Sequence, residues 1–160
     1  MTVVIGVGNP LMGDDGIGIA AISAVRDRWG ESESLSLVDG GTWGMNLLPL
    51  IESADRLLIL DAIDRGVAPG SLVALEGDDI PRQLAIKVSP HQTDLREALA
   101  LAELRGALPR VMVALGIQPA HVALSTDLSP IAAAGLPALL RDVDDRLRRW
   151  GHEPMAAAHA

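Results

Sequence analysis

The chain has 160 residues, which is enough for one domain with its own core. Aromatic residues make up 2% of it and the formal net charge is −8, so base stacking and phosphate binding are both disfavoured and nucleic acid is not an expected partner. The absence of cysteine excludes disulfides, thiolate nucleophiles and cysteine-ligated zinc.

The sequence has no secretory signal pattern and no apolar run that approaches about 18 residues. We therefore expect a cytoplasmic protein without a membrane-spanning segment. The composition is even up to the last helix. We therefore expect a single domain over residues 1–150, followed by a loose C-terminal tail at 151–160.

The first predicted element is a buried strand at residues 3–7, followed by a glycine-rich turn and a helix. The helix is indicated by an apolar stripe at Gly18, Ala21, Ile22, Val25 and Trp29. The turn lacks the third glycine of G-x-G-x-x-G, and Asp14 and Asp15 would repel a pyrophosphate, so a nucleotide site is not expected. One acid can cap the helix, which leaves the other for a cation or a polar substrate.

Three further strands follow, at residues 35–38, 56–60 and 71–75. A short helix is expected within 45–53, where Pro49 either kinks it or delays its start. If Asp61 is taken as the end of the strand at 56–60, only the nine residues 62–70 separate it from the strand at 71–75. A parallel crossover needs about a dozen residues, so the strand at 71–75 should run antiparallel at an edge of the sheet.

Two more helices carry proline signals at their starts. Ser89-Pro90-His91-Gln92 has the pattern of a capping box, and the helix should extend to about Leu104. A fifth strand is predicted at 111–115, and a last helix begins at Ser129-Pro130, with a break expected near Gly135 because Pro137 follows. Strands and helices thus alternate, which predicts a three-layer α/β/α domain.

Acidic residues follow each of the first three strands, at Asp14/Asp15, Asp39 and Asp61. Parallel strands bring these positions to one edge of the sheet. His91 falls in the first turn of its helix, where the helix dipole favours the neutral imidazole that binds metals. Two carboxylates and an imidazole are a ligand set that divalent metals accept. His121, in an irregular stretch, is interpreted as structural or exposed.

The sequence resembles the [NiFe]-hydrogenase maturation endopeptidases over nearly its whole length except the tail. The resemblance depends on an ordered set of motifs: Gly6-x-Gly8-Asn9-Pro10-Leu11-x-Gly13-Asp14-Asp15-Gly16-x-Gly18, Asp39-Gly40-Gly41-Thr42, Leu60-Asp61-Ala62, Ser89-Pro90-His91-Gln92 and Leu128-Ser129-Pro130. It implies a phosphorylase/hydrolase-like sandwich around a five-stranded, mostly parallel sheet with strand 4 antiparallel.

The resemblance also implies a function and a site. It implies removal of a C-terminal extension from the hydrogenase large-subunit precursor after nickel insertion. Matched by position, the nickel-recognition residues are Asp15, Asp61 and His91, which are also the best catalytic candidates, although no nucleophile is assigned. The turn at Asp39, Gly40, Gly41 and Thr42 is implicated in substrate recognition. Many members have Glu at the position of Asp15, so either a different client or a share of the role for Asp14 is possible.

On this hypothesis nickel is carried by the precursor and only transiently ligated by the protein. Cleavage proceeds through the metal or through an aspartate acting as base. Two alternatives stay open at this stage. One is a non-proteolytic module that binds nickel or the large subunit, and the other is a standalone zinc peptidase.

Overall fold

The computed structural model describes residues 1–41, 43–77, 80 and 90–156, with the side chains of 90–94 outside the described part. Its centre is one five-stranded sheet in the order β2-β1-β3-β5-β4. The strands are β1 (Thr2–Val7), β2 (Leu35–Gly41), β3 (Arg56–Ala62), β4 (Leu72–Glu76) and β5 (Val111–Ile117).

Four of the strands are parallel, and β4 pairs antiparallel with β5 at the sheet edge. Its register places Val73 opposite Gly116 and Leu75 opposite Ala114. The expected antiparallel strand is therefore confirmed, and the short connection from β3 explains it, because too few residues are available for a crossover helix.

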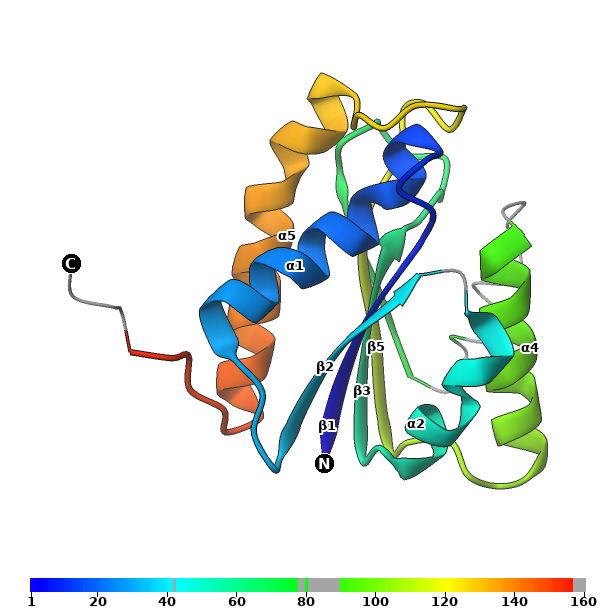
Figure 1. Cartoon of the computed structure of the whole chain (residues 1–160), viewed down its shortest axis with the longest axis vertical. Coiled ribbons are helices and arrows are strands. Elements are labelled where there is room, and N and C mark those ends of the chain that lie inside the picture. The colour runs from blue at the N-terminus through cyan, green and yellow to red at the C-terminus, as the bar shows by residue number, and fades with distance from the viewer. Residues whose placement is uncertain (42, 78–79, 81–89, 157–160) are drawn as a thin grey trace.

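Helices cover both faces of the sheet, which confirms the three-layer α/β/α architecture (Figure 1). One face is covered by α1 (Ile17–Trp29) and α5 (Pro130–Arg149), and the other by α2 (Leu48–Ser53) and α4 (Pro90–Leu104). The two 3₁₀ helices, η1 (Gly13–Gly16) and η2 (Gly44–Leu47), lead into α1 and α2.

Successive residues of the central strands enter the two cores alternately. Val4 and Leu58 pack with α1 and α5, whereas Ile5 and Ile59 pack with α2 and α4, and all four are fully buried. A strand covered on both faces needs apolar residues at every position, which is why the predicted strands are continuous apolar runs.

The structure extends the strands β2, β3 and β5 beyond their predicted carboxyl ends. Asp39 and Asp61 therefore lie within strands and not after them. The ladder explains the extension of β3, because Asp61 pairs with Gly116 of β5 and a strand ends where its partners end. In the region of Pro49, α2 starts late, after η2, with this proline in its first turn.

The expected break near Gly135 is wrong, since α5 is continuous and contains Pro137. Ser129 caps the helix by accepting a hydrogen bond from the Ala132 amide at 3.3 Å. The face of α5 that meets the sheet is fully buried on both sides of the proline, at Ala132, Leu139, Val143 and Leu147. Packing along this face holds the helix together despite the backbone hydrogen bond that proline cannot make.

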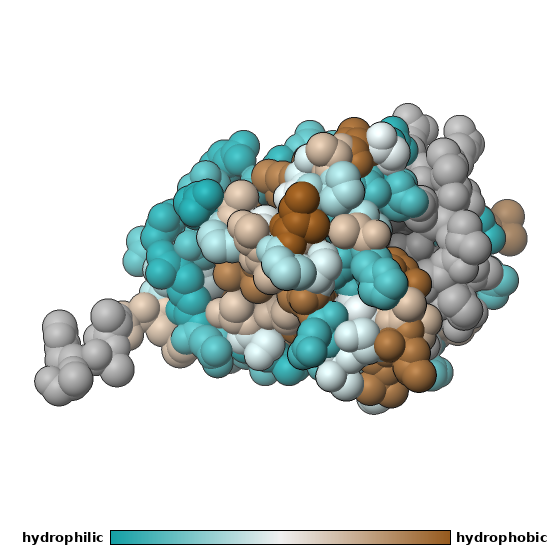
Figure 2. Space-filling model, turned by 90° about the horizontal axis from the view of Figure 1, so that it is seen from above, coloured by the Kyte–Doolittle hydropathy of each residue, from teal (hydrophilic) through white to brown (hydrophobic). Residues whose placement is uncertain are grey.

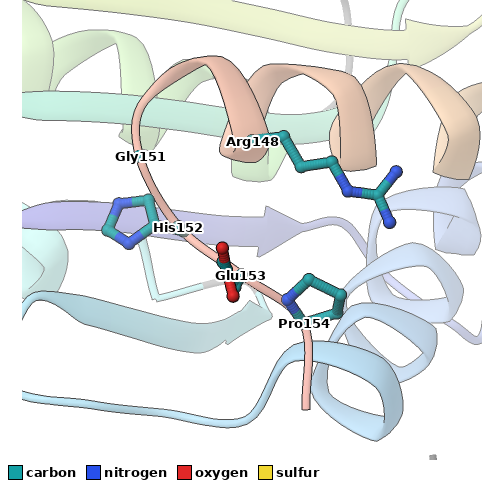
Figure 3. Close-up of a pocket in the computed structure, with 5 residues that line it drawn as sticks. All are labelled: Arg148, Gly151, His152, Glu153 and Pro154. Atoms are coloured by element: carbon teal, nitrogen blue, oxygen red, sulfur yellow. The ribbon is translucent and has the colours of Figure 1, made fainter. Parts of the chain in front are cut away.

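The segment after α5 lies at the opposite end of the sheet from the strand termini that hold the acids. His152 Nε2 is 2.9 Å from Thr2 Oγ1, at the start of β1, and the Met155 amide donates to the Arg28 carbonyl at 3.0 Å. Burial, with Arg56 and the N-terminus nearby, lowers the pKa of His152. A small pocket is lined by Arg148, Gly151, His152, Glu153 and Pro154 (Figure 3). The domain boundary at residue 150 stays a prediction.

Candidate active site at the carboxyl end of the sheet

The carboxyl ends of the parallel strands meet the starts of α1, α4 and α5 at one end of the molecule (Figure 1). Gly18 permits this approach on the side of α1. A Cβ on this residue would lie 2.2 Å from the carbonyl oxygen of Val7 and 2.3 Å from that of Leu60. Only a glycine fits there, so α1 begins directly against the ends of β1 and β3.

Asp15 and Asp61 are both buried at this end, with exposed fractions of 3% and 0%. Asp15 Oδ2 accepts a hydrogen bond from the Asn9 amide at 3.1 Å, and Asp61 Oδ1 accepts one from the Ala62 amide at 2.8 Å. A Cβ on Gly8 would lie 3.9 Å from Asp61 Oδ1. The two carboxylates therefore border consecutive residues, Gly8 and Asn9, of the turn after β1.

Asp14 has a different role from its neighbour, because its carboxylate binds the β5–α5 loop. Oδ2 accepts hydrogen bonds from the Ala120 amide at 2.8 Å, the His121 amide at 3.0 Å and the Ser129 hydroxyl at 2.8 Å. Oδ1 accepts one from the Ser129 amide at 2.7 Å. Asp14 is 1% exposed and caps neither η1 nor α1, so the N-cap interpretation is wrong for it and for Asp15.

The hydrogen bonds to Asp14 also determine its charge state. Burial alone would raise the pKa of this carboxyl, but hydrogen bonds from Ser129, Ala120 and His121 to the ionised form outweigh that effect and lower the pKa below 3.8. Asp14 is therefore ionised at neutral pH. Its four hydrogen bonds go to the loop that leads into α5.

Asp39 and Gly40 precede Gly41 at the end of β2, two strands away from β3. Asp39 is exposed, and its Oδ1 accepts a hydrogen bond from the Gly41 amide at 3.0 Å. Gly41 has a φ of +48°, which an L side chain rarely adopts. This turn thus presents a carboxylate to solvent at the same end of the sheet. Its role in substrate recognition stays a prediction, and Thr42 lies outside the described residues.

His91 lies in the first turn of α4, whose start is directed toward the same end of the molecule (Figure 1). Its side chain is outside the described part. Among the side chains that are described, no three of histidine, aspartate or glutamate form a group that could hold a metal ion. The joint assignment of Asp15, Asp61 and His91 to nickel therefore stays a prediction.

Sequence reasoning missed the interaction between Asp14 and Ser129. The sequence indicates Ser129 only as the N-cap of the last helix, and in the structure it is both that cap and a donor to Asp14. No local pattern connects two residues 115 positions apart, so only a three-dimensional structure reveals this pairing. His121 is exposed, as expected, and contributes through its backbone.

The end of the sheet that holds these residues is strongly acidic. The segments 8–16, 39–47, 61–71 and 118–130 contain six aspartates, one arginine, Arg65, and no lysine. The aspartates are Asp14, Asp15, Asp39, Asp61, Asp64 and Asp127. A cation, or a substrate with positive charge, is therefore attracted to this end of the protein.

A doubly covered, mostly parallel sheet with acidic groups at the carboxyl ends of its strands defines an α/β protein whose ligand site lies at that end. A model described as hydrogenase maturation protease matches residues 19–144. The chain belongs to this hydrogenase maturation protease family. It is therefore an enzyme that hydrolyses peptide bonds.

Individual relatives agree with this assignment. The hydrogenase expression/formation protein HoxM of Cupriavidus necator is 39% identical over 157 residues, covering 97% of this chain and 78% of that protein. The hydrogenase 2 maturation protease of Escherichia coli K12 is 33% identical, with 98% and 97% covered. The solved structure of the hydrogenase maturating endopeptidase HybD from E. coli has a TM-score of 0.90 at 32% identity, and 96% of each chain is covered.

None of the helices within the described ranges is both long and apolar enough to cross a membrane. The cytoplasmic location stays a prediction. The sequence left two alternative functions open. The family assignment disfavours the first, a binding module without protease activity. It does not bear on the second, a standalone zinc peptidase.

Proposed function

We propose that this protease removes the C-terminal extension from the large-subunit precursor of a [NiFe]-hydrogenase, and that it does so after nickel has been inserted. The observation that carries the proposal is the pair of buried carboxylates, Asp15 and Asp61, beside Gly8 and Asn9. Both carboxylates lie where the parallel strands of an α/β sheet place their ligands, and carboxylate oxygens are ligands that divalent metals accept.

Nickel is part of the substrate on this proposal, and the precursor brings it to the enzyme. Asp15, Asp61 and His91 supply oxygen and nitrogen ligands from three different elements, and the precursor supplies the others. Borderline divalent metals such as nickel accept imidazole and carboxylate ligands. A shell that is incomplete without the precursor allows the enzyme to distinguish a loaded precursor from an empty one.

The carboxylates also provide the chemistry of peptide hydrolysis. Two routes use the same residues: an aspartate accepts a proton from the attacking water, or the substrate-borne metal polarises the scissile carbonyl. In the first route the enzyme is of the aspartyl type. In both routes the turn at Asp39–Gly41, with its exposed Asp39 carboxylate, and Thr42 contact the precursor and place its C-terminal segment at the site.

The proposal is tested by incubating the purified protein with nickel-loaded and with nickel-free precursor, and following the C-terminal mass change by mass spectrometry. The loaded precursor should lose a short peptide, and the nickel-free precursor should stay intact. Equal cutting of both precursors would refute the nickel dependence. Failure to shorten the loaded precursor would refute the processing function.

Metal analysis of the purified protein separates this proposal from a zinc peptidase. The protein should contain far less than one equivalent of any transition metal before it meets the precursor. One equivalent of zinc that survives dialysis, together with cutting that is abolished by a chelator, would favour a resident zinc centre.

A further inference from the structure

We propose that Leu11, Val122 and Leu124 form a docking surface for the large-subunit precursor, next to the cleavage site; this inference rests on the proposed function. These three residues are called the apolar loop surface below. Leu11 belongs to the β1–η1 turn, and the other two belong to the β5–α5 loop. Both segments are at the carboxyl end of the sheet.

The three side chains are unusually exposed for their type. Leu124 is 85% exposed, Leu11 is 56% exposed and Val122 is 49% exposed. Figure 2 looks down on the upper end of Figure 1 and shows several separate groups of apolar residues among polar ones on this face. Exposed apolar residues with polar residues around them mark an interaction site when the segments that carry them lie together.

Backbone hydrogen bonds join the two segments that carry the surface. The Ser125 amide donates to the Leu11 carbonyl at 2.9 Å, and the Gly13 amide donates to the Ser125 carbonyl at 2.8 Å. Met12 and Ser125 also form an isolated parallel bridge. Leu11 therefore lies beside residues 122–125 although more than 100 positions separate them in the chain.

Asp14 also holds the loop of the apolar loop surface in place. The Asp14 amide donates to the His121 carbonyl at 2.9 Å, while the Asp14 carboxylate accepts from the loop at Ala120 and His121. A loop that is fixed before binding loses less conformational entropy when a partner binds. The backbone is thus ordered while the apolar side chains point away from the core, an arrangement that packing of this domain does not require.

Charge decides which partner fits the surface. Acidic side chains accompany it at Asp39 and Asp127, both exposed, and at Asp64, which is half-buried. A complementary partner therefore combines apolar with basic side chains. The surface continues into the turn that holds Asp15, only four residues after Leu11, so a protein bound on it reaches the cleavage site. The partner is thus a segment of the precursor itself that is both apolar and basic.

The test compares Leu124→Ser with Leu104→Ser. Both leucines are 85% exposed, but Leu104 ends α4 near the other end of the sheet (Figure 1). For the nickel-loaded precursor, Leu124→Ser should raise KM about 5-fold or more, because the variant loses the apolar area that the leucine buries against the precursor. Combining it with Leu11→Ser should raise KM further. Values of kcat at saturation should change less than about 2-fold, and Leu104→Ser should match the wild type.

Binding of the precursor is measured in parallel by surface plasmon resonance at two salt concentrations. The Kd values of the variants should rank in the same order as their KM values, and each Kd should rise with the salt concentration. The docking surface would be overturned if Leu124→Ser had the KM and Kd of the wild type. It would also be overturned if Leu104→Ser raised KM and Kd as much as Leu124→Ser does. A wild-type protein that binds the precursor but never shortens it would instead refute the proposed function, and the Kd values would still decide the docking surface.

Discussion

Asp14 and Ser129 form two hydrogen bonds with each other across 115 positions of the chain, at 2.7 Å from the Ser129 amide and 2.8 Å from its hydroxyl. The same hydroxyl oxygen accepts from the Ala132 amide and so caps α5. One carboxylate therefore connects the turn after β1 to the start of the last helix. The adjacent Asp15 is left for the candidate site.

Replacement of Asp14 should destabilise the whole domain. Asp14→Asn puts an amide group against backbone N–H donors, which leaves buried donors without acceptors and should lower the free energy of unfolding by about 3 kcal/mol. Urea unfolding followed by circular dichroism measures this loss. Asp127→Asn, an exposed aspartate of the same loop, is the control and should stay within about 0.5 kcal/mol of the wild type. Similar stabilities for the two variants would contradict the anchoring role of Asp14.

The lowered pKa of Asp14 predicts how this stabilisation depends on pH. Because the pKa in the folded protein is below the ordinary value of 3.8, the unfolded chain takes up the proton first as pH falls. The contribution of Asp14 is complete above about pH 4 to 5 and is lost as pH falls through the pKa of the folded protein. Urea unfolding of the wild type and Asp14→Asn between pH 6 and pH 3 should show a stability difference that narrows toward acid. A stability difference between the wild type and Asp14→Asn that grows as the pH falls would contradict a lowered pKa for Asp14.

Gly18 should tolerate no side chain. Gly18→Ala places its Cβ within 2.2 and 2.3 Å of two backbone oxygens, so α1 must move away from β1 and β3. The expected cost is about 2 to 4 kcal/mol of unfolding free energy. Gly106→Ala is the comparison, because Gly106 has a φ of +66° with open space around it and should cost only about 1 kcal/mol. A smaller loss for Gly18→Ala than for Gly106→Ala would refute this account of the turn.

Asp61→Asn should remove activity and leave the fold intact. The amide has nearly the same shape, and its oxygen can still accept the hydrogen bond from the Ala62 amide. Loss of the charge should reduce processing of the nickel-loaded precursor by about 100-fold or more, since even second-shell changes at metal sites cost 10- to 100-fold. Asp145→Asn, on the exposed face of α5, is the matched control. Undiminished processing by Asp61→Asn, with a native circular dichroism spectrum, would remove Asp61 from the site.

The fold was largely predictable because each major feature has a local signal. Apolar runs identify the buried strands. The antiparallel direction of β4 follows from the connection before it, because nine residues are too few for a parallel crossover. The continuity of α5 was not predictable, because the packing of Leu139, Val143 and Leu147 outweighs the local effect of Pro137. Local propensity fails there because tertiary contacts decide the result.

The candidate site was predictable in part. The positions of Asp15 and Asp61 follow from the rule that parallel strands end at one edge of the sheet. The division of roles between Asp14 and Asp15 does not follow from sequence, since two adjacent aspartates are equivalent until the partners of each carboxylate are known.

Nickel ligation by Asp15, Asp61 and His91 is tested most directly by X-ray absorption at the nickel edge. Nickel-loaded precursor is frozen alone and within milliseconds of mixing with the wild-type protein or with His91→Ala. We predict that mixing with the wild type increases the number of nitrogen and oxygen ligands around nickel, and that His91→Ala gives a smaller increase. A nickel spectrum that is the same with and without the protein would contradict the account.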